Sequence, residues 1–399
     1  MIVGAAVAGI ILRPRRVPSW ATPVAGAAIV VALGYESFPG AIAAIAAQWN
    51  VLLFIAGLMG LSLAAERSGA VDWFAGALSA AARGSCRRLF VLLFLGGAVV
   101  TCILSNDATA IVFTPIVYRT VANLKLDVRP FLLGCTFVAD TASFGLPFSN
   151  PANVLVLPRP DVAAYVWHLG PPQLAAIAIN LAIFMVVFRS ALRGRFEEEA
   201  YHPPSAAAIR VTVVLALLVA AYVLALACGW PLGPVAAIAA LAALALAGRS
   251  SPLEYPAQWG TFALLAGLFV LFDALARSGI VAWVSRELAA AAAFGRLAEI
   301  GTAAAGAALF SNVLNNLPVA VASSLAVANH GAAGVAYPLI AGIDLGPNLT
   351  LAGSLATILW AAALRQRDVR VDALEYARLG VLTVPPMLLG CVLWLWLVG

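Results

Sequence analysis

The chain contains a second copy of one of its own segments. Residues 47–73 and 257–283 align without a gap at a constant offset of 210, and 13 of the 27 positions are identical. A fixed internal period constrains the fold strongly, because each copy is expected to build the same structural unit. In a very apolar chain, two such units indicate a transporter with its site between two halves.

The composition is that of a membrane protein. Hydrophobic residues make up 63% of the 399 residues and charged residues only 10%, against about 25% charged residues in soluble domains. Apolar runs near the roughly 20 residues of a membrane-spanning helix recur along the chain. These features predict an all-α integral membrane protein. The five cysteines stand singly, so no metal centre or disulfide framework is predicted, and no cofactor is expected.

The repeat divides the chain into residues 1–190, a polar cytoplasmic linker at 191–206, and residues 207–399. Each half is predicted to hold five spans, one of them broken, and a re-entrant hairpin that does not cross the membrane. The predicted spans lie near 1–12, 20–36, 48–66, 131–157 and 173–189, then near 207–228, 232–248, 258–276, 337–363 and 379–398, with hairpins at 88–118 and 297–328.

Five spans in each half place the halves in opposite orientations, which predicts an inverted repeat. With both termini outside, 19 of the 23 Lys and Arg residues fall on the cytoplasmic face, as the positive-inside rule expects. Arg67 and its repeat equivalent Arg277 then lie on opposite faces. The basic pI of about 9.1 is therefore interpreted as contact with membrane lipid rather than with nucleic acid.

Three acids lie at membrane depth: Asp107, Asp140 and Asp344. An acid there costs about 2.5–3.5 kcal/mol, so it is normally turned inward and functional. The alternative is an Asp that caps a broken helix, and the two roles can coexist. Around these acids the polar runs contain Ser, Thr and Asn but no Arg, Lys or His. Such a site suits a small neutral polyhydroxy solute or a cation better than a multivalent anion.

Four ordered motifs carry a resemblance to a known family. Ser105-Asn106-Asp107, then 139–143 with Ser149-Asn150, then 315–318, and then 342–347 with 353–357 resemble the arsenical pump membrane protein family of the ion transporter superfamily. The resemblance implies export of arsenite, and of antimonite, across the plasma (inner) membrane. Family members use the proton gradient alone or work with a separate cytoplasmic, arsenite-stimulated ATPase.

The resemblance also implies roles for residues. Asp107, Asp140 and Asp344 are the candidates for proton coupling. The candidate substrate contacts are Ser105, Asn106, Asp107, Thr109, Asp140, Thr141, Ser149, Asn150, Asn153, Asn315, Asn316, Asp344, Ser354 and Thr357. Two positions depart from the family pattern, because Ile343 stands where Cys is common and Asn348 where Lys is common. Without that lysine, Asp344 lacks a possible counter-charge.

Other functions are open to the same residues. A sodium/proton antiporter of the superfamily would use three membrane acids equally well, whereas a carboxylate carrier is disfavoured by the lack of cations. No Ser–His or His–Cys arrangement lies at membrane depth, so the sequence does not indicate an enzyme. Cys102 and Cys135 are interpreted as small apolar core residues, since arsenite near neutral pH is an uncharged trihydroxide that suits amides and hydroxyls.

Overall fold

The computed structural model describes residues 20–197, 203–248, 259–277, 280–330, 333–365, 367, 369 and 371–399. The predicted span at 1–12 and part of the linker lie outside these residues. Within them the fold is all-helical, as predicted, and the one extended pairing is an isolated bridge between Ser85 and Arg195.

Several helices of the first half of the chain begin at short polar caps. Ser85 Oγ accepts from the N–H of Arg88, and Asp161 Oδ1 accepts from the N–H of Ala164, which satisfies N–H groups that a first helical turn leaves unpaired. The elements are α2 (Ala21–Ala32), α3 (Phe38–Ala47), α4 (Trp49–Arg67), α5 (Ala70–Ala81), α6 (Cys86–Ile103), α7 (Asn106–Ala108), the π-helical turn η1 (Thr109–Phe113), α8 (Thr114–Asn123), α9 (Val128–Thr141), α10 (Pro151–Val156) and α11 (Val162–Val187).

The second half follows the same order. Its elements are α12 (Ala206–Ala227), α13 (Leu232–Ala247), α14 (Trp259–Arg277), α15 (Ile280–Ala292), α16 (Arg296–Leu314), α17 (Asn316–His330), α18 (Ala333–Leu345), the 3-10 turn η2 (Gly346–Leu349), α19 (Leu355–Arg365) and α20 (Ala373–Val398). Three helices were not expected from the sequence, namely α3 and the equivalent pair α5 and α15. In addition, α11 begins at Val162, well before the predicted start at 173. The two prolines that precede the predicted start, Pro171 and Pro172, lie inside the helix.

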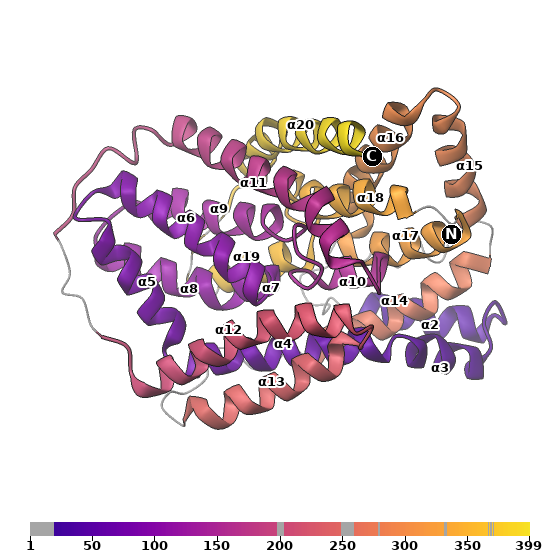
Figure 1. Ribbon diagram of the computed structural model, residues 1–399, viewed down its shortest axis with the longest axis horizontal. Helices are drawn as coiled ribbons and strands as arrows, with labels where there is room; N and C mark the ends of the chain where they lie inside the picture. Colours follow the sequence, from indigo (N-terminus) through magenta and orange to yellow (C-terminus); the bar gives the residue numbers. More distant parts are fainter. Residues whose placement is uncertain are drawn as a thin grey trace.

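Helices from the two halves pack side by side throughout the molecule (Figure 1). Helix α4 lies along α13, α2 along α14, and α11 along α20. Small residues allow the first of these contacts, since a side chain at Gly57 would meet the backbone of Ala236. Close approach at glycine and alanine is typical of helix packing in membranes.

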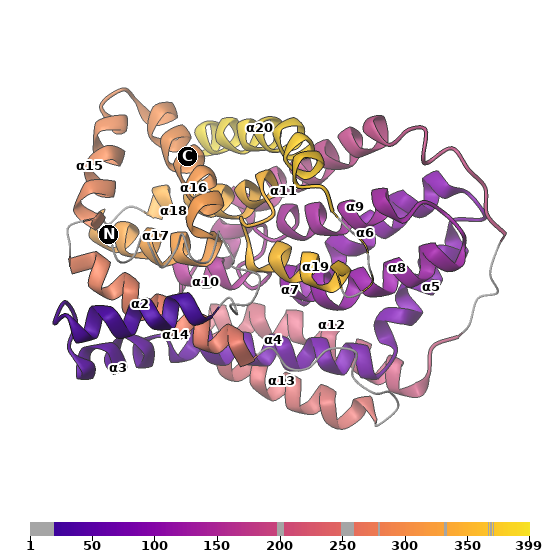
Figure 2. The same cartoon turned by 180° about the vertical axis from the view of Figure 1, so that it is seen from behind.

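The short helices after each break cross to the other half. Helix α19 packs against α7 and η1 of the first half, and α10 packs against α17 of the second. Figure 2, seen from behind, shows α19 lying against the first half beside α7. The centre of the molecule is therefore built jointly by both halves.

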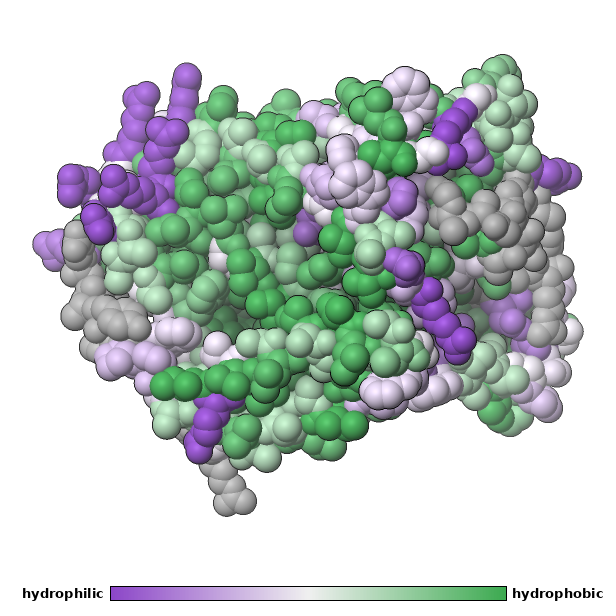
Figure 3. Space-filling model, viewed as in Figure 1, coloured by the Kyte–Doolittle hydropathy of each residue, from purple (hydrophilic) through white to green (hydrophobic). Residues whose placement is uncertain are grey.

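Large hydrophobic side chains are exposed on many of the described helices. Six helices within the described residues are long and apolar enough to cross a membrane, including α6 and α16, which were predicted as hairpin legs. Figure 3 shows hydrophobic side chains across the middle of the visible face and hydrophilic ones mostly toward its two ends. After the end of α11, Arg189, Arg193 and Arg195 are exposed. This is a multi-pass membrane protein, because such an apolar surface requires contact with lipid.

Candidate functional site

The first broken helix separates α9 from α10 between Thr141 and Pro151. Pro151 cannot donate a backbone hydrogen bond, and its neighbour Asn150 instead caps α10 by accepting from the N–H of Ala152 over 3.0 Å. Carbonyls that the break leaves without a helical partner accept from nearby side chains. Asn153 Nδ2 and Ser149 Oγ both donate to the carbonyl of Ser143, over 2.7 and 2.8 Å. The unwound segment is therefore held by its own polar side chains.

The second broken helix separates α18 from α19. Gly346 and Pro347 convert the end of α18 into a 3-10 turn, and the helix resumes at a cap formed by Ser354. Its Oγ accepts from the N–H of Thr357 over 3.0 Å and lies 2.9 Å from Thr357 Oγ1. Two hydroxyls are thereby placed together at the start of α19.

Each of the two buried acids is held by the opposite half of the chain. Asp140 Oδ2 accepts from Ser354 over 3.3 Å and from Thr357 over 3.1 Å. Asp344 Oδ1 accepts from Asn150 Nδ2 over 2.5 Å. Both side chains are buried. At the offset of 204 that relates Asp140 to Asp344, Asn150 corresponds to Ser354, so the two acids are held by equivalent residues.

The turns that follow α6 and α16 each donate a backbone hydrogen bond to a break, and the bonded residues are equivalent in the two halves. We call residues 104–107 the first tip and 314–317 the second tip. The N–H of Asn106 donates to the carbonyl of Ser149 over 3.3 Å, and the N–H of Asn316 donates to that of Gly353 over 2.9 Å. Asn315 forms the second turn with φ +77° and ψ 154°, a strained backbone conformation that is found almost only at glycine.

Asp107 differs from the other two acids in its surroundings. It is partly exposed, and its carboxylate makes no hydrogen bond or ion pair with any residue that the structure describes. The neighbouring Asn106 links it to the centre, since Asn106 Nδ2 donates to Asp140 Oδ1 over 3.4 Å and its Oδ1 accepts from the N–H of Asp107. Asp107 is therefore an accessible acid beside a buried one.

The remaining predicted residues serve local structure in this conformation. Ser105 caps α7, Thr109 bonds to Thr101 over 2.7 Å, and Asn315 Nδ2 donates to the carbonyl of Ala352. Thr141 Oγ1 donates to the carbonyl of Phe137 over 2.7 Å. The structure thus brings together Asn106, Asp140, Ser149, Asn150, Asn153, Asn316, Asp344, Ser354 and Thr357, and directs Ser105, Thr109, Thr141 and Asn315 into neighbouring contacts.

Several polar residues at the centre were not among the predicted contacts. Asn180 of α11 and Asn348 of η2 both donate to Thr141 Oγ1, over 2.8 and 3.2 Å. Gln173 accepts from the N–H of Gly145 over 2.5 Å. Asn180 and Gln173 are isolated amides in an apolar stretch, and that isolation was the available sequence signal, whereas Asn348 stands in the polar break at 344–350.

Several buried side-chain oxygens at this centre are acceptors without a hydrogen-bond partner among the described residues: Asn153 Oδ1, Asn180 Oδ1, Asn316 Oδ1, Asp344 Oδ2 and Asn348 Oδ1. The buried hydroxyls of Tyr165 and Tyr376, which can also donate, lack a partner among these residues as well. The amide orientations of Asn153 and Asn348 follow from their partners, because their Nδ2 atoms donate to carbonyls. An unsatisfied buried acceptor costs about 1–3 kcal/mol, so this centre is complementary to a donor or a cation.

Apolar spanning helices surrounding a buried polar centre made of two broken helices define a membrane transporter. The family follows from comparison of the sequence. The model of the citrate transporter family (CitMHS) matches residues 7–343, and the chain belongs to this family.

Two of the relatives carry the name that the motifs indicated. The chain is 29% identical to the arsenical pump membrane protein of Yersinia enterocolitica over 361 residues and to that of Escherichia coli K12 over 370 residues, covering 85% of this chain and 84% of each relative. An uncharacterized transporter of Mycobacterium tuberculosis is 23% identical over 371 residues, covering 88% of this chain and 86% of the relative. The resemblance stated from the motifs is confirmed.

The fold also occurs in a solved structure. The YdaH transporter of Alcanivorax borkumensis superimposes with a TM-score of 0.60 at 12% sequence identity, covering 99% of this chain and 97% of that one. At this identity the likeness concerns the fold alone.

Proposed function

We propose that this transporter exports arsenite, and antimonite, from the cytoplasm in exchange for protons. The observation that carries the proposal is the set of unpaired acceptor oxygens at the two breaks. Arsenite as a neutral trihydroxide offers three O–H donors, which these oxygens can accept. A carboxylate substrate would instead present acceptors to acceptors, and the relatives named arsenical pump membrane proteins favour the same conclusion.

The proposed roles follow the geometry of the centre. Asn153, Asn316 and the free oxygen of Asp344 would accept from the substrate, with Asn150, Ser354 and Thr357 holding the acids in place. The further candidates Ser105, Asn106, Thr109, Thr141, Ser149 and Asn315 would support the tips and breaks. Asp107, Asp140 and Asp344 would carry the coupled protons, because a buried or membrane-embedded acid is a normal proton carrier in transporters.

We also propose that residues 1–190 and 207–399 form inverted repeats of five spans, each with a re-entrant hairpin, joined by a cytoplasmic linker at 191–206 in the inner membrane. The equivalent bonds of Asn106 and Asn316 to their breaks support two units of the same design. An odd number of spans in each unit inverts the second unit and places both termini on the same side, and the distribution of Lys and Arg makes that side the outside. Tags at the two ends, tested for accessibility in intact cells and in everted vesicles, check this; two cytoplasmic tags would contradict it.

A sodium/proton antiporter is the second candidate, because unpaired carbonyl and carboxylate oxygens also suit a bare cation. The two functions predict different cargo for one site. The cytoplasmic, arsenite-stimulated ATPase is a further candidate partner, and resistance in a host that lacks this ATPase would indicate that the gradient suffices.

A transport assay decides between these functions. The chain is expressed in an arsenite-sensitive host that lacks its own pump, and its amount in the membrane is measured. Everted vesicles are then supplied with arsenite, antimonite, sodium or citrate while proton movement is followed. Arsenite-dependent proton movement together with restored growth supports the proposal. Absence of both, with the protein present in the membrane, contradicts it, and sodium-dependent proton movement alone favours the antiporter.

A further inference from the structure

Six exposed arginines gather at one end of the molecule, on two segments that are far apart in the sequence. The first segment carries Arg83, Arg87 and Arg88, at the start of α6, and the second carries Arg189, Arg193 and Arg195, after the end of α11. We call these six residues the arginine face. Figure 3 shows hydrophilic side chains at the end of the view where the chain leaves α11.

Backbone hydrogen bonds hold the two segments of the arginine face together. The N–H of Cys86 donates to the carbonyl of Gly194 over 3.2 Å. The N–H of Phe196 donates to the carbonyl of Gly84 over 3.0 Å. In the second segment, Leu192 is buried in the hydrophobic core. The arginines are therefore carried by a backbone that is fixed to the rest of the fold.

The positive charge of this face is not neutralised within the part of the chain that the structure describes. None of its six arginines forms an ion pair with a described residue, whereas Arg129 at the start of α9 pairs with Glu375. Asp127 accepts from the N–H of Arg129 as the cap of α9. The first turn of α6 contains no acid, although positive charge at this end of a helix is unfavourable beside the helix dipole. The face therefore needs an external anion.

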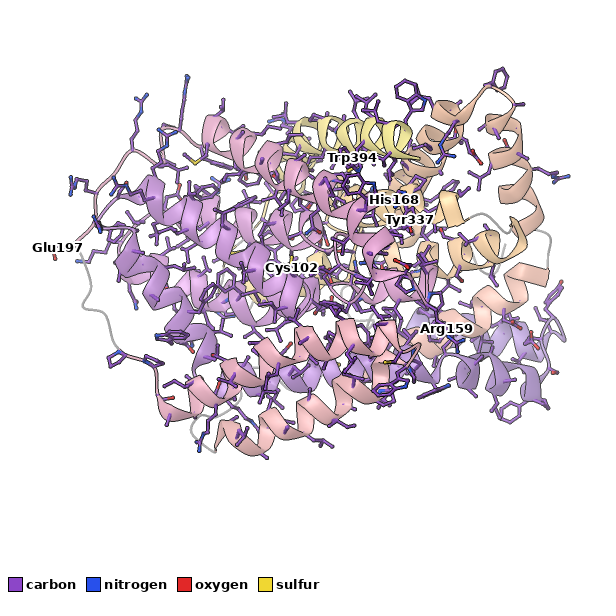
Figure 4. All side chains as sticks on the ribbon, in the orientation of Figure 1. Cys102, Arg159, His168, Glu197, Tyr337 and Trp394 are labelled. Atoms are coloured by element: carbon purple, nitrogen blue, oxygen red, sulfur yellow. The ribbon has the colours of Figure 1, made fainter. Side chains whose placement is uncertain are left out.

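Three glutamates follow the second segment along the chain, namely Glu197, Glu198 and Glu199. Glu197 is exposed and lies at the extreme end of the molecule in Figure 4, and the other two lie outside the described residues. Residues 83–88 and 189–199 together carry six arginines and three glutamates. The two segments therefore keep a positive charge even when every acid is counted.

The arginine face lies where two apolar helices end. Helices α6 and α11 are both long and apolar enough to cross a membrane, and the face joins the first turn of α6 to the residues that follow α11. The ends of spanning helices lie at the level of the phospholipid headgroups, and arginine side chains there extend toward the interface. A lipid headgroup is therefore the anion that this position brings nearest.

We propose that the arginine face binds the headgroups of anionic phospholipids, and that this binding holds the adjoining ends of α6 and α11 together. A guanidinium group donates paired hydrogen bonds to phosphate oxygens, and an anionic lipid surface attracts basic segments beside a spanning helix. A zwitterionic headgroup brings its own cation, which the arginines repel. Helix α6 leads to the first tip, and α11 carries the amides that bond to the first break, so the bound lipid would steady the frame around the centre.

The test follows thermal unfolding of the full chain, purified in a non-ionic detergent, while a water-soluble short-chain phospholipid is added. Phosphatidylglycerol is the probe, and phosphatidylcholine of the same chain length and inorganic phosphate are the comparisons. We expect phosphatidylglycerol to raise the unfolding temperature of the parent at concentrations at which the other two compounds leave it unchanged. The concentration that gives half of this increase measures the affinity.

The first pair of variants removes or keeps two charges at the start of α6. The variant with Arg87→Gln and Arg88→Gln is expected to need roughly 25-fold more phosphatidylglycerol, since each arginine near an anionic surface is worth about a fivefold factor in affinity. The variant with Arg87→Lys and Arg88→Lys keeps both charges, and its affinity is expected to stay within about threefold of the parent.

The second pair of variants compares the other segment with arginines elsewhere on the surface. The variant with Arg189→Gln and Arg193→Gln is expected to lose affinity to the same degree as the Gln variant of α6. The matched control carries Arg159→Gln and Arg286→Gln, which also removes two exposed arginines, and Figure 4 places Arg159 well away from Glu197. This control is expected to bind phosphatidylglycerol as the parent does.

Five results would overturn lipid binding at the arginine face. The first is an unchanged affinity in both Gln variants of the face, and the second is an equal effect of phosphatidylcholine on the parent. The third is an equal affinity for inorganic phosphate, which would mean a site for a soluble anion. The fourth is tighter binding of poly-L-glutamate than of phosphatidylglycerol, which would mean an acidic protein partner. The fifth is an equal loss in the Lys and Gln variants of α6, which would mean a structural effect.

The outcome is separate from that of the transport assay. No residue of the arginine face has been assigned to the substrate or to proton coupling, and none of the lipid measurements uses arsenite. Loss of lipid binding would leave the proposed function intact, and failure of arsenite transport would leave the lipid site intact.

Discussion

Asn150 donates a 2.5 Å hydrogen bond to Asp344, and this bond joins the broken helix of one half to the acid of the other. Ser354 makes the reciprocal bond to Asp140 over 3.3 Å. Each break is therefore anchored to the opposite half, and neither can move without changing the hydrogen bonds of the partner acid. A coupled transporter needs such a link, because protonation on one side must affect substrate held on the other.

The first prediction concerns Asn150→Ala. The substitution removes the cap of α10 and the partner of Asp344, so we expect a loss of stability of about 1–2 kcal/mol. We also expect the transport rate to be at least about tenfold lower than that of a surface variant. The reciprocal variant Ser354→Ala is expected to behave alike, because it caps α19 and binds Asp140. Detergent thermal unfolding and arsenite transport measure the two effects. Unchanged transport in both variants would contradict the crossed anchoring.

The internal repeat made much of this centre predictable. The offset of 210 located Asn106 and Asn316 as equivalent tip residues, and the backbone N–H groups of both bond to equivalent carbonyls. The crossed bonds could not be predicted, because an offset tells which residues are equivalent but not which ones touch. Helices α5 and α15 were missed for a different reason, since their 12 and 13 residues are too short for the length criterion of a span.

The second prediction separates the acids by their surroundings. Asp107→Asn is expected to abolish proton-coupled transport while leaving thermal stability unchanged, because no described residue bonds to that carboxylate. Asp140→Asn is expected to lower stability as well, by about 1–3 kcal/mol, since its new amide group would face the donors Asn106, Ser354 and Thr357. Full coupled transport by Asp107→Asn at neutral pH would remove Asp107 from the mechanism.

The third prediction concerns a thiol at the centre. Cys102 Sγ lies 3.4 Å from the carbonyl of Ala142 and 3.6 Å from Gln173 Nε2, near the middle of the molecule in Figure 4. Its repeat equivalent Asn312 bonds to the carbonyl of Gly346, which indicates a structural role for this position. Cys102→Ser is therefore expected to keep arsenite transport within about threefold. If arsenite were held by this thiol, the variant would lose arsenite transport while retaining any other cargo.

The sequence was less informative about the amides that complete the centre. Asn180 and Gln173 lie within a long apolar helix, and nothing in their spacing relates them to Thr141 or Gly145. Their roles depend on how α11 is rotated against the first break, which is set by packing between helices rather than by local pattern. The substrate roles of the predicted residues stay a prediction until transport is measured.

The fourth prediction tests the packing that holds the second break. Gly380 of α20 faces the backbone of Asn348 and Leu349 so closely that an added methyl group would overlap the carbonyl of Asn348. Gly380→Ala must therefore displace either α20 or η2, and overpacking of this kind costs about 1–3 kcal/mol. Because η2 lies between Asp344 and Ser354, we expect transport to fall at least tenfold.

A matched glycine provides the control for this effect. Gly76 lies within α5, and a methyl group added there meets no atom within 4 Å. Gly76→Ala is expected to raise stability slightly, by up to about 1 kcal/mol, because alanine favours the helix, and to leave transport unchanged. Thermal unfolding in detergent and arsenite transport in vesicles, measured on both variants at equal membrane abundance, check the contrast. Equal behaviour of the two variants would mean that close contact between α20 and the second break is not required for transport.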